Sequence, residues 1–170
     1  MTNEPRVAER PPTPYVGVTR TVTMATIAEI ADQIPRVIES AVALGLEPAG
    51  APFLRYDVID MARELVVEAG IPLAHPAPPG TPLGDLEAGA LPGGRYATVV
   101  HVGHPATLAD ATAALLRWAA DGGLAFDVLT DERGDVWGCR LESYLTDPRD
   151  EPDMSRWETE LAFRLAGDPA

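Results

Sequence analysis

The apolar residues near the N-terminus first repeat at every second position and then follow a helical period. Val16, Val18 and Val22 share one face of residues 15–23, which predicts a half-buried strand. A stripe at three- and four-residue steps then predicts a helix, and it comprises Ile27, Ile30, Ile34, Ile38 and Ala41. Because proline cannot donate to the carbonyl four residues back, Pro35 predicts a kink, or a short helix ending near Gln33 and a second one starting at Pro35. Gly45 is the expected stop.

Three short strands and a loop are predicted next. The strands cover residues 52–57, 64–69 and about 85–90. Residues 76–84 contain four prolines and two glycines, so this segment must be a loop. The last of the three strands leads to the turn Leu91-Pro92-Gly93-Gly94.

The second half of the chain repeats the order strand, helix, strand, strand. A strand rich in β-branched residues covers residues 95–103, and a helix covers 107–121 with Thr107 and Asp110 placed as a capping pair. Its apolar stripe is Leu108, Ala111, Leu115 and Ala119. Gly122-Gly123 ends the helix, and strands are predicted over residues 136–145 and 157–165.

This repetition predicts a duplicated α+β fold with pseudo-two-fold symmetry. The two copies lie roughly 80 to 90 residues apart. Their sheets can pair edge to edge, with the helices on one face and a ligand groove on the other. We expect a flexible tail at residues 1–13, one domain at 14–166 with halves 14–91 and 92–166, and a short tail at 167–170. The alternative is one irregular α+β sandwich without duplication.

The charge of the chain speaks against binding to nucleic acid. The sequence has 26 acidic and 13 basic residues and a formal net charge of −13. Because affinity for a phosphate backbone comes largely from Lys and Arg displacing counterions, such a surface repels DNA and RNA. An acidic protein attracts cations instead, although most of these carboxylates serve only solubility.

Cysteine content and hydropathy indicate a cytoplasmic protein. Cys139 is the only cysteine, which excludes an internal disulfide and a multi-cysteine metal site. The N-terminus has no basic-then-apolar signal pattern, and no apolar run approaches the roughly 20 residues that span a bilayer. We therefore expect no membrane association. Neither a glycine-rich phosphate loop nor a serine-elbow motif occurs, and no cofactor is expected.

Glu142 is the main candidate for binding chemistry. Strand alternation places Arg140, Glu142 and Tyr144 on one face. The other face holds Trp137, Cys139, Leu141 and Leu145, which we expect to pack under the helices. A carboxylate in an apolar groove resists ionisation unless a positive charge lies nearby, and a hydrophobic cation supplies that charge. The alternative is a solvent-exposed Glu142 paired with Arg140.

Several aromatic residues are candidates for the walls of this groove. Tyr144, Tyr56 and Phe53 offer large contact areas. Phe53 and Tyr56 have opposite parity on their strand, so alternation cannot place both in the groove. Trp118 and Trp157 are further candidates, although each is more often a structural residue.

The remaining polar residues give weaker signals. His101 and His104 have a His-x-x-His spacing, but they lie at a strand end without a third ligand nearby, so a structural pair is expected rather than a metal site. His101 is also a candidate groove residue. Cys139 lies on a packed face, where thiols are inert. Residues 131–135 form a polar turn without the spacing of a calcium loop.

Six motifs in order across residues 15–166 resemble the GyrI-like family, the effector-binding domain of bacterial AraC-type and MerR-type multidrug regulators. The motifs are Gly50-Ala51-Pro52-Phe53-Leu54-Arg55-Tyr56, Glu68-Ala69-Gly70-Ile71-Pro72-Leu73, Leu91-Pro92-Gly93-Gly94-Arg95-Tyr96-Ala97, His101-Val102-Gly103, Glu142-Ser143-Tyr144-Leu145-Thr146-Asp147-Pro148 and Trp157-Glu158-Thr159-Glu160-Leu161. The resemblance implies that Glu142 anchors a ligand and that Tyr56 is a groove wall. The sequence departs from the family at His104-Pro105-Ala106, where an aromatic wall is missing, and in the number of prolines between residues 76 and 82.

Three functions are compatible with these residues. The favoured one is a multidrug-type sensor or sequestering protein that binds a small hydrophobic molecule, with a cation as the expected ligand. The second is hydrolysis of cyclopropane-containing genotoxins, which the resemblance permits, with Glu142 as general base and Tyr144 orienting the substrate or donating a proton. The third is inhibition of a separate protein partner, as some family members act on DNA gyrase.

Overall fold

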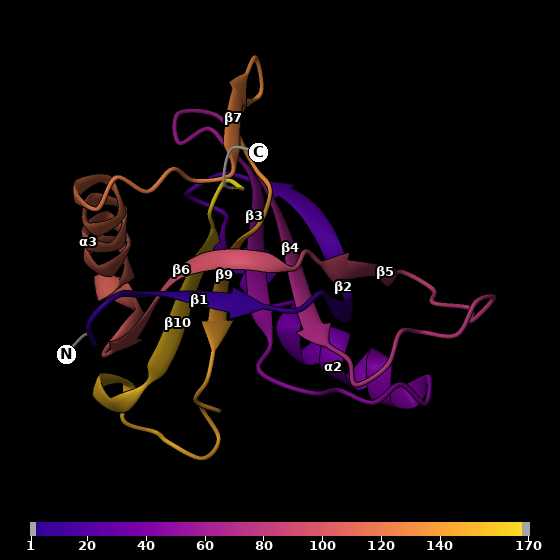
Figure 1. The fold of residues 1–170 in the computed structure, drawn as a ribbon. Coiled ribbons are helices and arrows are strands. Elements are labelled where there is room, and N and C mark those ends of the chain that lie inside the picture. The colour runs from indigo at the N-terminus through magenta and orange to yellow at the C-terminus, as the bar shows by residue number, and fades with distance from the viewer. Residues whose placement is uncertain (1–2, 168–170) are drawn as a thin grey trace.

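One antiparallel sheet forms the framework of the molecule (Figure 1). The structure is a computed structural model that describes residues 3–167, and within them the sheet has ten strands. The strand order is β1-β6-β10-β9-β3-β4-β2-β5, and the β7–β8 hairpin joins it through β3. The strands are β1 (Arg6–Arg10), β2 (Thr13–Val22), β3 (Phe53–Ile59), β4 (Leu65–Pro72), β5 (Glu87–Leu91), β6 (Gly94–Val102), β7 (Val128–Asp131), β8 (Gly134–Trp137), β9 (Arg140–Tyr144) and β10 (Glu158–Arg164).

The helices confirm the pattern that predicted them. They are α1 (Ala28–Ala31), α2 (Ile34–Ala43) and α3 (Leu108–Asp121), with 3-10 turns η1 (Pro105–Thr107) and η2 (Met154–Arg156). Pro35 lies in the first turn of α2, where its missing N–H has no intrahelical partner to lose. Gly45 follows α2 with a φ of 75°, a conformation that favours glycine. None of the helices formed by residues 3–167 is long and apolar enough to cross a membrane.

The strand order confirms the predicted duplication. Outward from the central β9–β3 pair, the order is β10-β6-β1 on one side and β4-β2-β5 on the other. Each half therefore supplies a strand, a helical segment and two further strands, as β2-α2-β3-β4 and β6-α3-β9-β10. The alternative of one irregular sandwich is wrong.

The predicted boundary between the halves puts β5 in the first half; when the halves are counted as β1–β4 and β5–β10 instead, each sends one strand to the other. β1 precedes β2 in the chain but pairs with β6, and β5 precedes β6 but pairs with β2. The prediction of a flexible tail at residues 1–13 is therefore wrong for Arg6–Arg10, which pair in register with residues 94–98. The composition of this segment suggested a tail. It is ordered instead by pairing with a strand far along the chain, which composition does not reveal. Residues 1–2 and 168–170 of the two expected tails lie outside the described residues.

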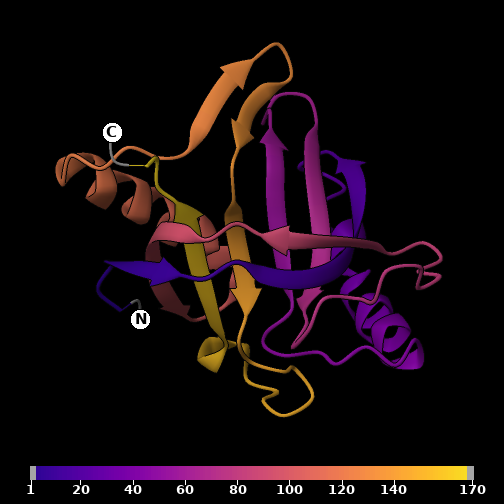
Figure 2. The same ribbon diagram turned by 45° about the vertical axis from the view of Figure 1, so that its right-hand side comes forward.

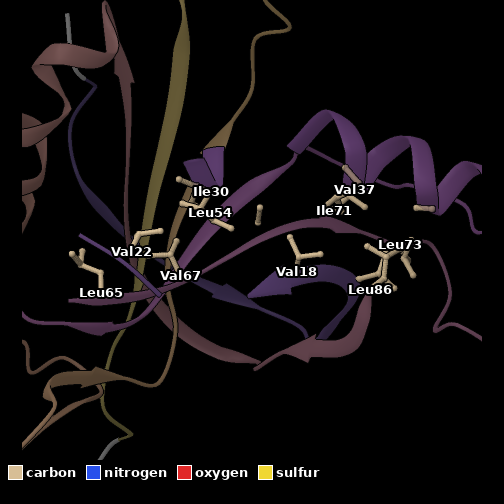
Figure 3. Close-up of a cluster of buried hydrophobic side chains, with 13 residues drawn as sticks. Val18, Val22, Ile30, Val37, Leu54, Leu65, Val67, Ile71, Leu73 and Leu86 are labelled. Atoms are coloured by element: carbon tan, nitrogen blue, oxygen red, sulfur yellow. The ribbon is translucent and has the colours of Figure 1, made fainter. Parts of the chain in front are cut away.

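Both helical layers cover the same face of the sheet. Beneath α1 and α2, buried Ile30, Val37 and Ala41 pack on residues of β2, β3 and β4, including the predicted Val16, Val18 and Val22 (Figure 3). Beneath α3, the predicted stripe packs on β6 and β10, where Val99, Leu161 and Phe163 are buried. These two clusters lie side by side on the sheet, and the seam between them is formed by β3 and β9.

The opposite face is closed by the sheet itself. The continuous segments β1–β2 and β5–β6 run across the front of β3, β4, β9 and β10 (Figures 1 and 2), so the sheet curls into a half-barrel. A third cluster fills its inside, comprising Tyr15, Phe53, Leu91, Tyr96, Cys139, Leu141 and Ala162.

A polar network lies on this inner face beside the third cluster. The hydroxyl of Tyr15 donates to Glu68 Oε1 over 2.6 Å. Arg55 Nε lies 3.1 Å from Asp57 Oδ1 and 3.7 Å from Glu68 Oε2. Arg55 Nη2 also donates to the carbonyl of Gly138 over 3.0 Å, which ties β3 to the second half. Burial, followed by the hydrogen bond to Glu68 and its charge, raises the pKa of Asp57 to about 8.

The strand expected at residues 136–145 is divided into β8 and β9 at Gly138. A Cβ at Gly138 would overlap the carboxylate of Asp127, which forms an ion pair of 2.7 Å with Arg164. The chain therefore bends over this ion pair, and alternation does not continue through it.

β7 was also missed, because its residues are mostly exposed and carry no alternating apolar pattern. The predicted polar turn at residues 131–135 is confirmed as the tip of the β7–β8 hairpin.

The expected capping pair at the start of α3 is wrong. The side chain of Thr107 forms no capping hydrogen bond with the helix. Its hydroxyl donates to the carbonyl of His104 over 2.7 Å and lies 2.7 Å from His101 Nε2. The turn η1 precedes α3 and draws the threonine away from the capping position.

Candidate ligand-binding site

The register of β9 places Glu142 on the helix-bearing face, at the seam between the two halves. Glu142 pairs with Leu54 of β3 on one side and with Leu161 of β10 on the other. Residues paired across antiparallel strands share a face. Leu54 belongs to the cluster under α1 and α2, and Leu161 belongs to the cluster under α3. Glu142 therefore lies between the two helical layers.

This placement corrects the sequence-based assignment of the faces. Cys139 and Leu141 were expected under the helices, but they are buried in the third cluster on the opposite face. Leu145 was expected to be packed with them and is 45% exposed beyond the end of β9. Alternation groups residues that share a face, but it does not reveal which face the helices cover.

Two tyrosine hydroxyls hold the carboxylate of Glu142. Tyr144, two residues along the same strand, donates to Oε1 over 2.5 Å, and Tyr56 of β3 donates to Oε2 over 3.4 Å. Burial raises the pKa of Glu142, while the hydrogen bonds from Tyr144 and Tyr56 and the charge of Arg140 offset part of that effect. Burial also raises the pKa of both tyrosines, so they remain protonated donors at neutral pH.

Arg140 is a half-buried cation that lies against three aromatic rings. Its Cζ lies 4.5 Å from the ring centroid of Phe163, 4.8 Å from that of Trp137 and 6.0 Å from that of Tyr56. Burial lowers the pKa of Arg140. Among residues 3–167, no acidic side chain lies within ion-pair distance of it. The alternative, a solvent-exposed Glu142 that forms an ion pair with Arg140, is therefore wrong.

Sequence reasoning missed Phe163 and Trp137 as neighbours of Arg140. Phe163 pairs with Arg140 across β10 and β9, a contact between residues far apart in sequence. Trp137 was expected on the opposite face, but the bend at Gly138 brings its ring over the guanidinium. The Nε1 of Trp137 is buried and has no hydrogen-bond partner among the described residues. The rings of Phe163, Trp137 and Tyr56 form an aromatic box around Arg140. This box could have been predicted only if the strand pairing had been known.

The other predicted wall residues are not all at the site. Phe53 is buried in the third cluster, where its ring meets that of Tyr15 edge-on at 5.4 Å between centroids, so Tyr56 rather than Phe53 reaches Glu142. Trp118 packs against the cluster under α3. Trp157 donates from Nε1 to the carbonyl of Glu151 over 2.8 Å.

Both histidines contact Thr107, His101 through its ring and His104 through its backbone carbonyl. His101 is buried and lies in the same cross-strand row as Tyr144, with Thr159 between them. This places His101 on the helix-bearing face, near the β6 edge of the seam. His104 Nδ1 accepts a hydrogen bond from the backbone N–H of Ala106 over 3.0 Å.

Two tyrosine side chains pack beside Glu142. Tyr56 and Tyr144 pack against the cluster under α1 and α2. A cavity of about 310 Å³ lies elsewhere, between α2, β2 and residues 82–86, and another of about 600 Å³ lies near the β7–β8 hairpin; neither is lined by Glu142.

Comparison with solved structures finds the same fold in effector-binding and hydrolase proteins. The C-terminal domain of EcmrR has a TM-score of 0.75 at 18% identity, with 97% of this chain and 98% of that chain covered. SAV2435 bound to tetraphenylphosphonium has a TM-score of 0.61 at 13% identity, covering 97% and 95%. A hydrolase from Listeria innocua has a TM-score of 0.56 at 14% identity, covering 96% and 92%.

Two further comparisons concern longer chains and sequence families. This chain covers 58% of the EcmrR chain in an EcmrR–DNA complex, with a TM-score of 0.75 at 19% identity. A search of curated proteins found no match. The family model of the GyrI-like small molecule binding domain matches residues 3–166. The strand order, the paired halves and this match together show that the chain belongs to the GyrI-like small-molecule-binding domain family.

Proposed function

We propose that this small-molecule-binding domain takes a hydrophobic cation at the seam between α2 and α3, with Glu142 as the anionic anchor. The observation that carries the proposal is the partly buried carboxylate of Glu142, whose pKa is raised by burial and which lies among aromatic rings. A carboxylate in such surroundings gains most from a cation that brings its own apolar surface. The bound cation lowers the pKa of Glu142 again and keeps it ionised.

The aromatic rings near Glu142 favour the same ligand chemistry. The guanidinium of Arg140 already lies over three ring faces, which is the contact a cation prefers. Tyr56, which is one of these three rings, and Tyr144 also place their hydroxyl groups beside the carboxylate. The likeness in fold to SAV2435 bound to tetraphenylphosphonium supports the choice of a lipophilic cation as the test ligand.

The test compares two ions of equal shape and opposite charge. Tetraphenylphosphonium and tetraphenylborate are titrated by calorimetry against the wild type, Glu142→Gln and the control Glu158→Gln. Glu158 is exposed on β10, so its substitution changes the net charge equally without touching the site. The wild type is expected to prefer the cation, and Glu142→Gln to weaken cation binding at least tenfold, about 1.4 kcal/mol. Equal cation affinity of wild type and Glu142→Gln would refute the proposal.

Hydrolysis is the second candidate function, favoured by the raised pKa of Glu142 and the adjacent Tyr144. Glu142 would accept a proton from the water that attacks a cyclopropane carbon, and Tyr144 would donate one to the carbon released by ring opening. Burial raises the pKa of Tyr144, which makes it a poor donor and ranks this function second. Turnover of an activated cyclopropane that Glu142→Gln abolishes is the expected result for a hydrolase. If the substrate binds but is not turned over, hydrolysis is excluded and only the binding function remains.

A further inference from the structure

One cavity lies against α2 and is not lined by Glu142. Its volume is about 310 Å³, which is near the lower end of the range for small-molecule sites. It lies between α2, β2 and residues 82–86, at the end of the proline-rich loop. Buried Val18, Val37 and Leu86 form an apolar floor, and Figure 3 shows them at the space between α2 and β2.

One face of α2 lines this cavity with both polar and apolar side chains. Gln33, Arg36, Val37 and Ser40 follow the three- and four-residue spacing of a single helical face. Arg20 lies two residues from Val18 on the same face of β2. Arg20 of β2 and Arg36 of α2 therefore line the cavity from different elements.

Neither of these arginines is neutralised by an acidic side chain. Among residues 3–167, no carboxylate lies within 4.0 Å of the guanidinium of Arg20 or Arg36, whereas Arg10 and Arg164 form ion pairs of 2.7 Å. Arg20 Nη1 donates to the carbonyl of its neighbour Thr19 over 2.9 Å, and Arg36 Nη1 donates to Gln33 Oε1 over 3.3 Å.

The charged residues that line this cavity are positive on balance, opposite in sign to the chain as a whole. In a chain of net charge −13, Asp85 is the single acidic residue among those lining it, against two arginines. A guanidinium binds a carboxylate through parallel N–H donors, and two of them that line one cavity can share one anionic head.

We propose that this cavity is a second small-molecule site, which takes an amphipathic carboxylate. The carboxylate lies between Arg20 and Arg36, and a compact apolar body rests on Val18, Val37 and Leu86. Ser40 and Gln33 supply further hydrogen-bonding groups on the helix wall. The ligand is opposite in charge to the one proposed for the Glu142 seam, so the two sites select different molecules.

The test uses naphthalene-2-carboxylate and its neutral amide as probes. Both are titrated against the wild type, Arg20→Gln, Arg36→Gln, the double variant and the control Arg117→Gln, an exposed arginine of α3. Each single substitution is expected to weaken carboxylate binding several-fold, and the double variant at least tenfold. The amide should bind the wild type weakly and respond little to the substitutions. Binding should also weaken with added salt, because the arginines are exposed.

Two results would overturn the proposal. One is a double variant that binds the carboxylate as tightly as the wild type does. The other is an Arg117→Gln variant that loses as much carboxylate affinity as the cavity variants, which would indicate general charge attraction. Ser40→Trp fills the cavity from an exposed position of α2 without removing a charge and is expected to abolish binding. Glu142→Gln should bind the carboxylate as the wild type does, so this site and the cation site succeed or fail separately.

Discussion

Two carboxylates on opposite faces of the sheet are held in surroundings that favour their protonated form. Glu142 faces the helical layers and accepts hydrogen bonds from two tyrosines. Asp57 faces the inside of the half-barrel and shares its surroundings with Glu68 and Arg55. Their consequences differ, because Glu142 lies at the seam that we propose as the ligand site, whereas Asp57 belongs to a network that ties the strands together.

The network around Asp57 makes the stability of the fold depend on pH. A carboxyl whose pKa is higher in the folded chain holds its proton at pH values where the unfolded chain has released it. Its contribution to the free energy of unfolding is therefore full below the ordinary value of 3.8 and is lost as the pH rises to about 8. Asp57→Asn is expected to remove that loss, so the difference in urea midpoint between pH 5 and pH 9 becomes smaller than in the wild type.

Asp60→Asn is the matched control for this pH dependence. The hydrogen bond from Arg63 lowers the pKa of Asp60, so its contribution is lost only as the pH falls below its ordinary range. Between pH 5 and pH 9 this variant should follow the wild type. A wild-type pH difference that persists in Asp57→Asn would show that the dependence comes from other groups.

At this scale the sequence predicted which residues gather but not how they are oriented. Alternation and the family motifs named Tyr56, Glu142 and Tyr144, and their side chains do meet. The box around Arg140 could not be predicted, because Phe163 and Trp137 reach it through strand pairing and a bend. Asp57 and Glu68 escaped notice for the same reason, since they come from different strands.

At the scale of single elements, periodic segments were predictable and short edge strands were not. α2, α3, β2 and β6 carry an apolar stripe or alternation that packs on a core, so the pattern and the structure agree. β1 and β7 are mostly exposed and are paired with β6 and β8. Such strands leave little trace in the pattern of hydrophobic residues.

The close packing of β3 on β4 gives a prediction at the element scale. Gly70 pairs with Phe53, whose ring covers the glycine so closely that a Cβ would lie 2.5 Å from Cζ. Gly70→Ala is expected to lower the free energy of unfolding by about 1–3 kcal/mol through overpacking, measured by urea denaturation. Gly167→Ala meets no neighbouring atom and should stay within about 0.5 kcal/mol of the wild type. Equal effects of the two substitutions would contradict this account of Phe53.

For the whole molecule, the duplicated order was predictable and the exchange of strands between halves was not. Repeated periodicity predicts two copies of a unit, and the symmetric strand order around β9–β3 agrees with it. Which copy a strand joins depends on pairing between distant residues, which no local pattern encodes. The exchange of β1 and β5 also curls the sheet and encloses the third cluster, which makes a separate inner face for the Asp57 network.

The exchange of β1 also sets the order in which the molecule can be completed during synthesis. Within this domain β1 is synthesised before the other strands, yet Thr98 of β6, which pairs with Arg6, follows 92 residues later. At typical rates of translation, this strand waits on the order of ten seconds without a partner. The first-made segment of the domain is therefore among the last to be placed, and a nascent chain interrupted after its first half exposes the inner face that β6 would have helped to close.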